Sequence, residues 1–206
     1  MKKIILGLVF SLTLSFGATF NEGMDAINKK DFKVALKIFE KLASKNHAGA
    51  QNQLGLMYYT GNGVKQDYLK AKEWLEKSAV QGQIEAQYNL GIFYSNGQGV
   101  KQDYLKAKEW YEKAANNGYY KAQFNLGAMY DNGYGVKQDY FKAKEWYEKA
   151  ANQGLTEAQN NLGFFYSNGY GVKKNLKKAK EYFGKACDGG YQSGCDNYKI
   201  LNQQGY

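Results

Sequence analysis

The chain has 206 residues, with 28 basic and 19 acidic side chains, and 44% of its residues are hydrophobic. That content is enough for a buried core but too low for a polytopic membrane protein, and 16% aromatic residues exclude a disordered chain. Proline is absent, so the commonest helix breaker is missing and an all-helical protein is favoured. The net charge of +9 would suit nucleic acid only if lysines clustered. They mostly alternate with acidic residues, and we expect no nucleic-acid partner.

Residues 1–18 have the pattern of a secretory signal peptide. Lys2 and Lys3 precede an apolar stretch over residues 4–16, and the small residues Gly17 and Ala18 follow. This pattern predicts cleavage after Gly17 or Ala18. The alternative, an uncleaved anchor helix, is disfavoured because the stretch is short for a membrane span. We expect an exported chain, periplasmic or extracellular, with no integral membrane insertion after cleavage and a net charge of +7 without the two lysines.

The next segment, residues 19–46, predicts one helix hairpin with a short connection. The step from Gly23 to Ala35 is 12 residues, whereas the equivalent step from Gly91 to Ala107 is 16 residues. The first hairpin therefore lacks a loop that all later hairpins have, and we expect it to cap the N-terminal end.

From residue 47 the chain repeats itself every 36 residues. Leu-Gly pairs recur at Leu54-Gly55, Leu90-Gly91, Leu126-Gly127 and Leu162-Gly163, and tyrosines recur at Tyr58, Tyr94, Tyr130 and Tyr166. Glycine pairs recur at Gly61/Gly63, Gly97/Gly99, Gly133/Gly135 and Gly169/Gly171. Glycines at such fixed places indicate chain reversals with positive φ rather than flexibility.

Each repeat predicts two helices. In the first, Ala86, Leu90 and Tyr94 form a single apolar stripe, and Gly91 allows a neighbouring helix to approach closely. The second begins after a capping residue, which is Asp67, Asp103, Asp139 or Asn175 in the four repeats. Its surface carries i,i+4 pairs such as Glu109 and Lys113, which we expect to form ion pairs.

A hairpin with such a narrow stripe cannot bury it alone, so successive hairpins must stack into a right-handed α-solenoid. The predicted organisation is a leader at 1–18 and one all-α domain at 19–206. Within the domain we place the hairpin 19–46, repeats at 47–82, 83–118, 119–154 and 155–190, and a capping helix in 191–206.

The pattern Ala-Gln-x-Asn-Leu-Gly-x-x-Tyr-x-x-Gly-x-Gly-Val stands at 86–100, 122–136 and 158–172. It resembles the Sel1-like repeat, a relative of the tetratricopeptide repeat with a longer loop inside each hairpin. The hairpin 19–46, without that loop, resembles an ordinary tetratricopeptide unit. The resemblance implies a protein-binding or peptide-binding scaffold whose first helices line a concave face.

Two cysteines, Cys187 and Cys195, flank the predicted turn at Gly189-Gly190, at the end of one helix and the start of the next. In an exported protein we expect them to form a disulfide. A free thiol pair is the alternative, and metal binding is disfavoured because no histidine lies near. The one histidine, His47, falls at a predicted helix start, where a capping or solvated role is expected.

The Cys-x7-Cys spacing on Sel1-like repeats behind a signal peptide resembles the Helicobacter cysteine-rich protein family. That resemblance implies an alternative function, binding or weak hydrolysis of β-lactams, or of a cell-wall-derived ligand. The residues give it little support, since none of Ser44, Ser78, Ser95, Ser167 and Ser193 has a lysine three positions on. One histidine cannot build a zinc site, and no P-loop motif is present. We expect no catalytic residue, metal or cofactor.

Comparison of the four repeats distinguishes positions that stay the same, as packing requires, from positions that vary and can form a binding surface. Four first-helix positions vary between repeats, at i, i+3, i+7 and i+10, which places them on one face. We expect this concave face to bind the partner through Asn52, Leu56, Tyr88, Ile92, Phe124, Asp131, Asn160 and Phe164. Tyr88 and Phe124 are the predicted anchors. Three recurring asparagines, Asn89, Asn125 and Asn161, either hold a peptide backbone or hydrogen-bond between helices.

Overall fold

The computed structural model describes residues 19–206, and the predicted leader with its cleavage point lies outside this range. Over the described residues the chain forms eleven helices and no strand, which confirms the all-α prediction. The N-terminal helices are α1 (Phe20–Asn28), α2 (Phe32–Ala43), α3 (Ala48–Thr60), α4 (Tyr68–Ala79), α5 (Ile84–Asn96) and α6 (Tyr104–Asn116). The C-terminal helices are α7 (Tyr120–Asn132), α8 (Tyr140–Asn152), α9 (Thr156–Asn168), α10 (Leu176–Asp188) and α11 (Gln192–Gln203).

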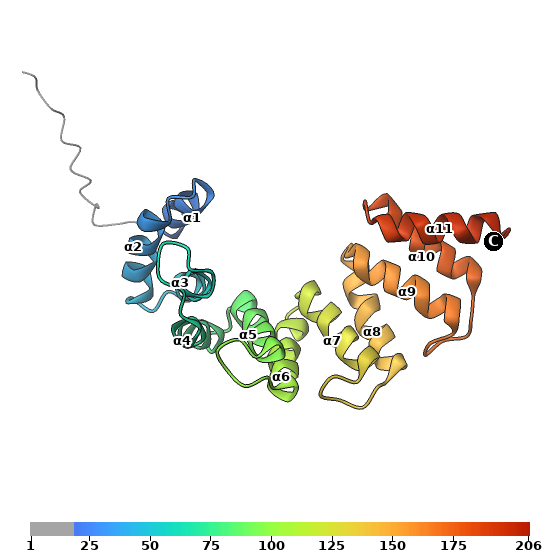
Figure 1. Cartoon of the computed structure of the whole chain (residues 1–206), viewed down its shortest axis with the longest axis horizontal. Coiled ribbons are helices and arrows are strands. Elements are labelled where there is room, and N and C mark those ends of the chain that lie inside the picture. The colour runs from blue at the N-terminus through green and yellow to red at the C-terminus, as the bar shows by residue number, and fades with distance from the viewer. Residues whose placement is uncertain (1–18) are drawn as a thin grey trace, which may run out of the picture.

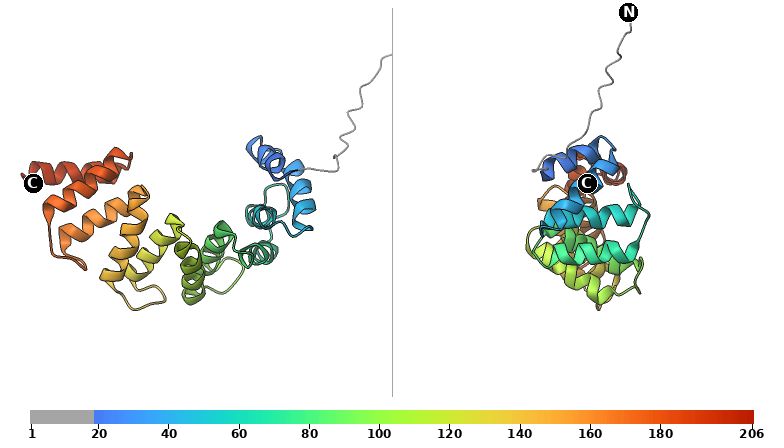
Figure 2. Two further views of the ribbon diagram at one scale, coloured as in Figure 1. Left: turned by 180° about the vertical axis from the view of Figure 1, so that it is seen from behind. Right: turned by 90° about the vertical axis from the view of Figure 1, so that its left-hand side faces the viewer.

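The helices form antiparallel hairpins that follow one another along an arc, with α1 and α11 at its two ends (Figure 1). Each helix packs mainly on its neighbours in the chain. Viewed from behind in Figure 2, the hairpins form one curved row. The chain is therefore an α-solenoid, in which each hairpin completes its core against the next one.

The helix ends are set by the predicted residues. The side chains of Asp67, Asp103, Asp139 and Asn175 each accept a hydrogen bond of 3.0 Å from the backbone N–H three residues on. His47 caps α3 in the same way, since its Nδ1 accepts from the Ala50 N–H at 3.1 Å. The first helices end at glycines in the left-handed conformation, for example Gly97 with φ 68°.

The glycine of each Leu-Gly pair lies where the second helix of the same hairpin approaches. A Cβ atom on Gly127 would lie 2.5 Å from the Cδ1 atom of Tyr147, which is 1% exposed. Gly91 faces Tyr111 and Gly163 faces Phe183 in the same arrangement. These glycines therefore make room for the buried aromatic rings, as the sequence predicts.

The glutamine of the Ala-Gln motif joins successive hairpins. Gln87 Nε2 donates to the carbonyl of Ala79 at 3.2 Å, and Gln123 Nε2 donates to that of Ala115 at 3.2 Å. The Gln123 Oε1 atom accepts from Gln153 at 2.8 Å, as that of Gln51 accepts from Gln81 at 2.6 Å. Among the described side chains, however, the Oε1 atoms of Gln87 and Gln159 are buried without a hydrogen-bond partner.

Comparison of the repeats suggests a stabilising substitution that would give the Gln87 Oε1 atom a hydrogen-bond partner. Asn117 stands where Gln81 and Gln153 stand in the neighbouring repeats, but its shorter side chain bonds to the Lys113 carbonyl instead. We expect Asn117→Gln to reach Gln87 Oε1 and to raise the free energy of unfolding by about 1 kcal/mol. Chemical denaturation measures this change, and a Gln87→Ala background should abolish the gain. A gain that persists in that background would contradict the assignment.

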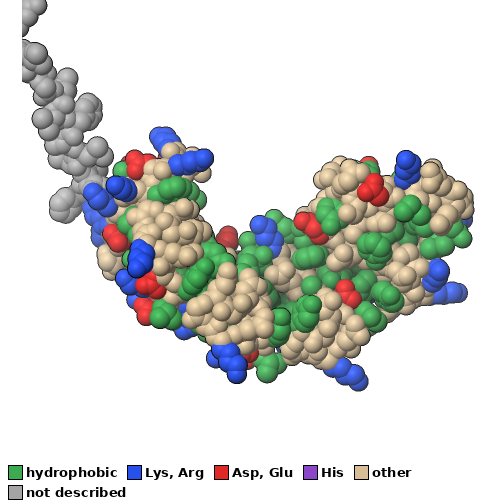
Figure 3. Space-filling model, in the orientation of Figure 1, with side chains coloured by type: hydrophobic (Ala, Val, Ile, Leu, Met, Phe, Trp, Pro, Cys, Tyr) green, Lys and Arg blue, Asp and Glu red, His purple; other side chains and the backbone are tan. Residues whose placement is uncertain are grey.

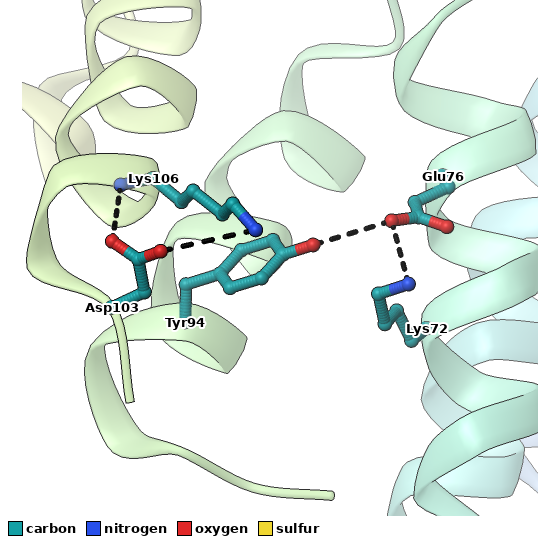
Figure 4. A network of polar contacts seen from close by, with 5 residues as sticks. All are labelled: Lys72, Glu76, Tyr94, Asp103 and Lys106. Carbon is teal, nitrogen blue, oxygen red and sulfur yellow. Dashed lines mark hydrogen bonds and ion pairs between the residues drawn. The ribbon is translucent and has the colours of Figure 1, made fainter. Parts of the chain in front are cut away.

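Ion pairs lie at different positions from those predicted. Lys113 Nζ lies 3.8 Å from the centre of the Trp110 ring one turn earlier, so it makes a cation–π contact in place of the expected pair with Glu109. The i,i+4 pairs of the second helices are Lys72–Glu76 at 2.9 Å, Lys108–Glu112 at 2.7 Å and Lys144–Glu148 at 3.5 Å. Glu76 also accepts from the Tyr94 hydroxyl of the next repeat at 3.4 Å, so this pair bridges two hairpins (Figure 4).

Cys187 and Cys195 form a disulfide between α10 and the capping helix α11, with their Cα atoms 4.5 Å apart. The predicted pairing is confirmed. The bond closes a short loop at the C-terminal end and fixes the last helix on the solenoid.

Reduction of this disulfide is expected to cost about 2–3 kcal/mol on a chain-entropy estimate. Because solenoid stability is largely nearest-neighbour, α11 and α10 should lose hydrogen-exchange protection first, while α1 to α4 keep theirs. A useful variant is Cys187→Ala with Cys195→Gln, since the preceding repeat has Ala151 and Gln159 at these positions. It should behave like the reduced chain. Uniform loss of protection along all helices would contradict the prediction.

Candidate functional site

A hollow of about 420 Å³ lies between α5 and α7. Its lining is uncharged and mostly aromatic, hydroxyl or amide: Tyr88, Ile92, Ser95, Asn96, Tyr104, Tyr111, Asn125, Ala128, Met129 and Tyr134. Tyr88 and Ile92, two of the predicted face residues, lie in it. The hollow therefore contains part of the surface that the sequence pattern predicts.

A second, smaller hollow of about 100 Å³ adjoins the first on its N-terminal side. It is lined by Leu56, Tyr59, Leu75, Asn89, Ile92 and Phe93, again without a charged residue. Ile92 borders both hollows, so together they extend across α3, α5 and α7. We call the residues lining the two hollows the first-helix groove.

The two predicted anchors are more deeply packed than the sequence suggests. The Tyr88 ring is half-buried, with its centre 5.0 Å from that of Tyr119 and 5.9 Å from that of Tyr111. Phe124 is half-buried against Tyr147 at 5.5 Å. Both rings are thus only partly exposed, because Tyr111 of α6 and Tyr147 of α8 pack against them. Phe164, in contrast, is 42% exposed.

Asn52 and Asn160, predicted as face residues, are 3% and 4% exposed and so cannot form an open surface. Each accepts a hydrogen bond from the asparagine 37 residues on: Asn89 at 3.1 Å and Asn197 at 3.3 Å. For Asn89, the helix-to-helix alternative is therefore the one the structure shows. These bonds join α3 to α5 and α9 to α11.

The other two recurring asparagines lie beside tyrosine hydroxyls. Asn125 lies by Tyr88 and Tyr111, and Asn161 lies by Tyr147. Burial raises the pKa of Tyr111 to about 12, and hydrogen bonding to Ser95 and Asn125 opposes the rise. Tyr88, whose pKa burial also raises, and Tyr111 therefore stay neutral at physiological pH and act as hydrogen-bonding groups.

Asp131 introduces a carboxylate near the C-terminal end of α7. It accepts from the Tyr147 hydroxyl at 3.2 Å, and burial raises the pKa of its carboxyl group. Ser95, at the equivalent position one repeat earlier, lies 3.3 Å from the Tyr111 hydroxyl. The groove lining is thus uncharged, and the position of Ser95 is occupied one repeat later by the carboxylate of Asp131.

The geometry gives no support to serine or metal chemistry. Ser95, the serine that lines the groove, donates to the Ile92 carbonyl at 3.0 Å, and Ser78 donates to the Ala48 carbonyl at 2.7 Å. Residues 19–206 contain no group of three or more His, Cys, Asp or Glu side chains placed to hold a metal ion. In the same part of the chain, no helix combines the length and apolar character needed to cross a membrane.

Loops and second helices supply a part of the groove that the repeat pattern did not predict. Tyr134, between the turn glycines Gly133 and Gly135, stacks on Tyr104 with ring centres 5.3 Å apart. Tyr170 stacks on Tyr140 in the next repeat at 4.7 Å. The 36-residue step between Tyr134 and Tyr170 could have indicated that both belong to the repeat pattern. Their contact with the preceding repeat could be seen only in the folded structure.

The stacked hairpins and the groove across their first helices define a helix-hairpin repeat protein. Its sequence matches the Sel1 repeat over residues 21–47, 48–83, 84–119, 121–155 and 156–191, and the chain belongs to this family. The match includes the N-terminal hairpin, which we expected to depart from the Sel1 pattern, although only residues 29–31 connect its two helices.

Solved structures of the same fold support this assignment. A protective antigen of uropathogenic Escherichia coli with an SLR fold is 38% identical, with a TM-score of 0.81 over 82% of this chain and 36% of its own. A Sel1 repeat protein from Oxalobacter formigenes is 32% identical, with a TM-score of 0.79 over 84% of this chain and 68% of its own. Cysteine rich protein B of Helicobacter pylori is 31% identical, with a TM-score of 0.50 over 61% of this chain and 95% of its own.

The chain thus spans about a third of the length of the Escherichia coli antigen. A comparison with curated protein sequences finds no match.

Proposed function

We propose that this chain is an exported binding scaffold that holds a protein or peptide segment in the first-helix groove. The observation that carries the proposal is the uncharged lining of tyrosine, amide and aliphatic side chains, continuous across three first helices. Aromatic and amide groups of this kind provide contact area and adaptable hydrogen bonds at low entropic cost. Protein interaction is also typical of the Sel1 repeat family.

The groove favours an extended segment over a compact ligand. Its two hollows differ in volume, about 420 and 100 Å³, and they meet at Ile92. An extended peptide could place a large side chain in the first hollow and a small one in the second. Asn96 and Asn125 line the first and could pair with the peptide's backbone.

The test is site-specific photo-crosslinking in the producing cell. A photo-reactive amino acid at Ile92 should crosslink one defined partner, which mass spectrometry of the adduct identifies. Val80 serves as the control position, since it is 75% exposed and lies outside the groove. Equal crosslinking from both positions, or a crosslink from Val80 alone, would refute binding through the groove.

Export is supported by the leader pattern in residues 1–18 and by the Cys187–Cys195 disulfide, a bond that persists in oxidising compartments. Cell fractionation with N-terminal sequencing tests it. We expect a mature chain that starts at Ala18 or Thr19 outside the cytoplasm. A cytoplasmic chain that keeps Met1 would contradict export without affecting the groove.

A further inference from the structure

The loops between paired helices, with the first turn of the second helix, form a continuous edge of the solenoid. We call residues 65–70, 101–106, 137–142 and 173–178 the loop edge. Each loop packs against the preceding repeat, because Gly99 lies on Tyr68, Gly135 on Tyr104 and Gly171 on Tyr140. The four segments therefore lie next to one another although 36 residues separate them in sequence.

The positive charge of the chain is concentrated on this edge. Its ten lysines are Lys65, Lys70, Lys101, Lys106, Lys137, Lys142, Lys173, Lys174, Lys177 and Lys178, and its three acidic residues are Asp67, Asp103 and Asp139. Residues 19–206 contain 26 lysines and 19 acidic residues, so the remaining 16 of each kind balance. The whole net charge of +7 thus belongs to the loop edge. Figure 3 shows lysines at intervals along the outer side of the arc.

Two features keep this charge available. The edge lysines are exposed, apart from the half-exposed Lys178. Two ion pairs lie on the edge. Lys106 lies 3.8 Å from Asp103 (Figure 4), and Lys142 lies 3.7 Å from Asp139. In the last repeat Asn175 replaces the aspartate, so four lysines stand together there without an acidic residue.

Large apolar side chains project from the same edge. Leu69 and Leu105 are each 63% exposed and Phe141 is 56% exposed, all at the second residue of α4, α6 or α8. Helix stability requires no apolar residue at such a position. Exposed apolar side chains that recur with the repeat and are surrounded by lysines are typical of a surface that binds another protein or a membrane.

We propose that the loop edge docks the solenoid on an anionic lipid surface. Lysines would pair with acidic headgroups, while Leu69, Leu105 and Phe141 would enter the boundary between headgroups and acyl chains. A soluble polyanion such as nucleic acid or an acidic polysaccharide would use the lysines but leave the apolar row without a role. The proposal does not depend on the peptide-binding groove.

Vesicle flotation tests this proposal. The chain from Thr19 to Tyr206 holds every described helix and lacks the apolar leader, which could itself bind lipid. We expect it to float with vesicles of phosphatidylglycerol and phosphatidylcholine but not with phosphatidylcholine alone. Lys173→Gln, Lys174→Gln and Lys177→Gln together should reduce partitioning at least about tenfold, and Leu69→Ser, Leu105→Ser and Phe141→Ser together should do the same.

Matched controls separate the edge from general charge and hydrophobicity. Lys29, Lys33 and Lys37 are also exposed, but on the N-terminal hairpin, so their replacement by glutamine should leave partitioning within about twofold of the unchanged chain. Val80→Ser with Ile200→Ser removes exposed apolar residues elsewhere and should also have little effect. Equal binding to both vesicle types would overturn the proposal. So would flotation unchanged in the Leu69/Leu105/Phe141 variant, the result expected of a polyanion site.

Discussion

Replacing Tyr88 and Phe124 by asparagine is expected to weaken binding of the crosslinked partner by about 1,000-fold, with the fold retained. Aromatic hot spots commonly contribute about 2 kcal/mol or more each, and these two side chains present half-buried rings on α5 and α7. Isothermal titration with the identified partner measures the loss.

Asparagine is the right replacement because the chain already uses it there. Asn52 and Asn160 occupy the equivalent positions and accept hydrogen bonds from Asn89 and Asn197. Tyr88→Asn and Phe124→Asn would place the same acceptor opposite Asn125 and Asn161, which stand 37 residues on as in those pairs. The solenoid should therefore stay folded, which thermal unfolding followed by circular dichroism verifies.

A control pair removes the same residue types elsewhere. Tyr198 is 38% exposed on α11 and Phe141 lies on the loop edge, so Tyr198→Asn with Phe141→Asn should bind the partner normally. Unchanged affinity in the Tyr88/Phe124 variant, or an equal loss in the control, would contradict binding of the partner through Tyr88 and Phe124.

The largest loss of stability is expected when the close-packing glycines of the central repeats gain a methyl group. In Gly91→Ala with Gly127→Ala, each new Cβ atom would overlap a buried ring, Tyr111 or Tyr147. Overpacking of this kind typically costs about 1–3 kcal/mol per site, more than the roughly 1 kcal/mol that alanine gains over glycine in a helix. Chemical denaturation should report a net destabilisation, with α5 to α8 losing hydrogen-exchange protection first.

Gly184 provides the matched control. It also lies inside a helix, but a Cβ atom there would lie 3.3 Å from the exposed side chain of Tyr198, which can move aside. Gly184→Ala should therefore be neutral or stabilising by up to about 1 kcal/mol. If the Gly91/Gly127 variant were as stable as this control, the glycines would not be what permits the close approach of the helices.

Most of the fold was predictable because each helix boundary and turn recurs in several repeats, so each could be recognised several times. Gly61, Gly97, Gly133 and Gly169 hold the same left-handed backbone, and the capping aspartates hold the same hydrogen bond. A single copy of such a motif would have been ambiguous. The disulfide was predictable since both cysteines flank one tight turn at the end of the solenoid.

The binding face was predictable only in part. Periodicity indicates the direction in which a side chain points but not which neighbouring side chains cover it. Asn52 and Tyr88 occupy equivalent positions, yet the shorter side chain is buried and bonded to Asn89. The contribution of Tyr134 depends on a loop that folds back on the preceding repeat. The loop edge was missed for the same reason, since its lysines are dispersed in sequence and gathered by the superhelix.

Hydrogen–deuterium exchange of the chain with and without its crosslinked partner tests the central claim most directly. Binding in the first-helix groove predicts added protection in residues 88–96 of α5 and 124–132 of α7, with no change in 101–106 or 137–142 on the loop edge. Protection confined to the loop edge, or to the second helices α4, α6 and α8, would contradict it.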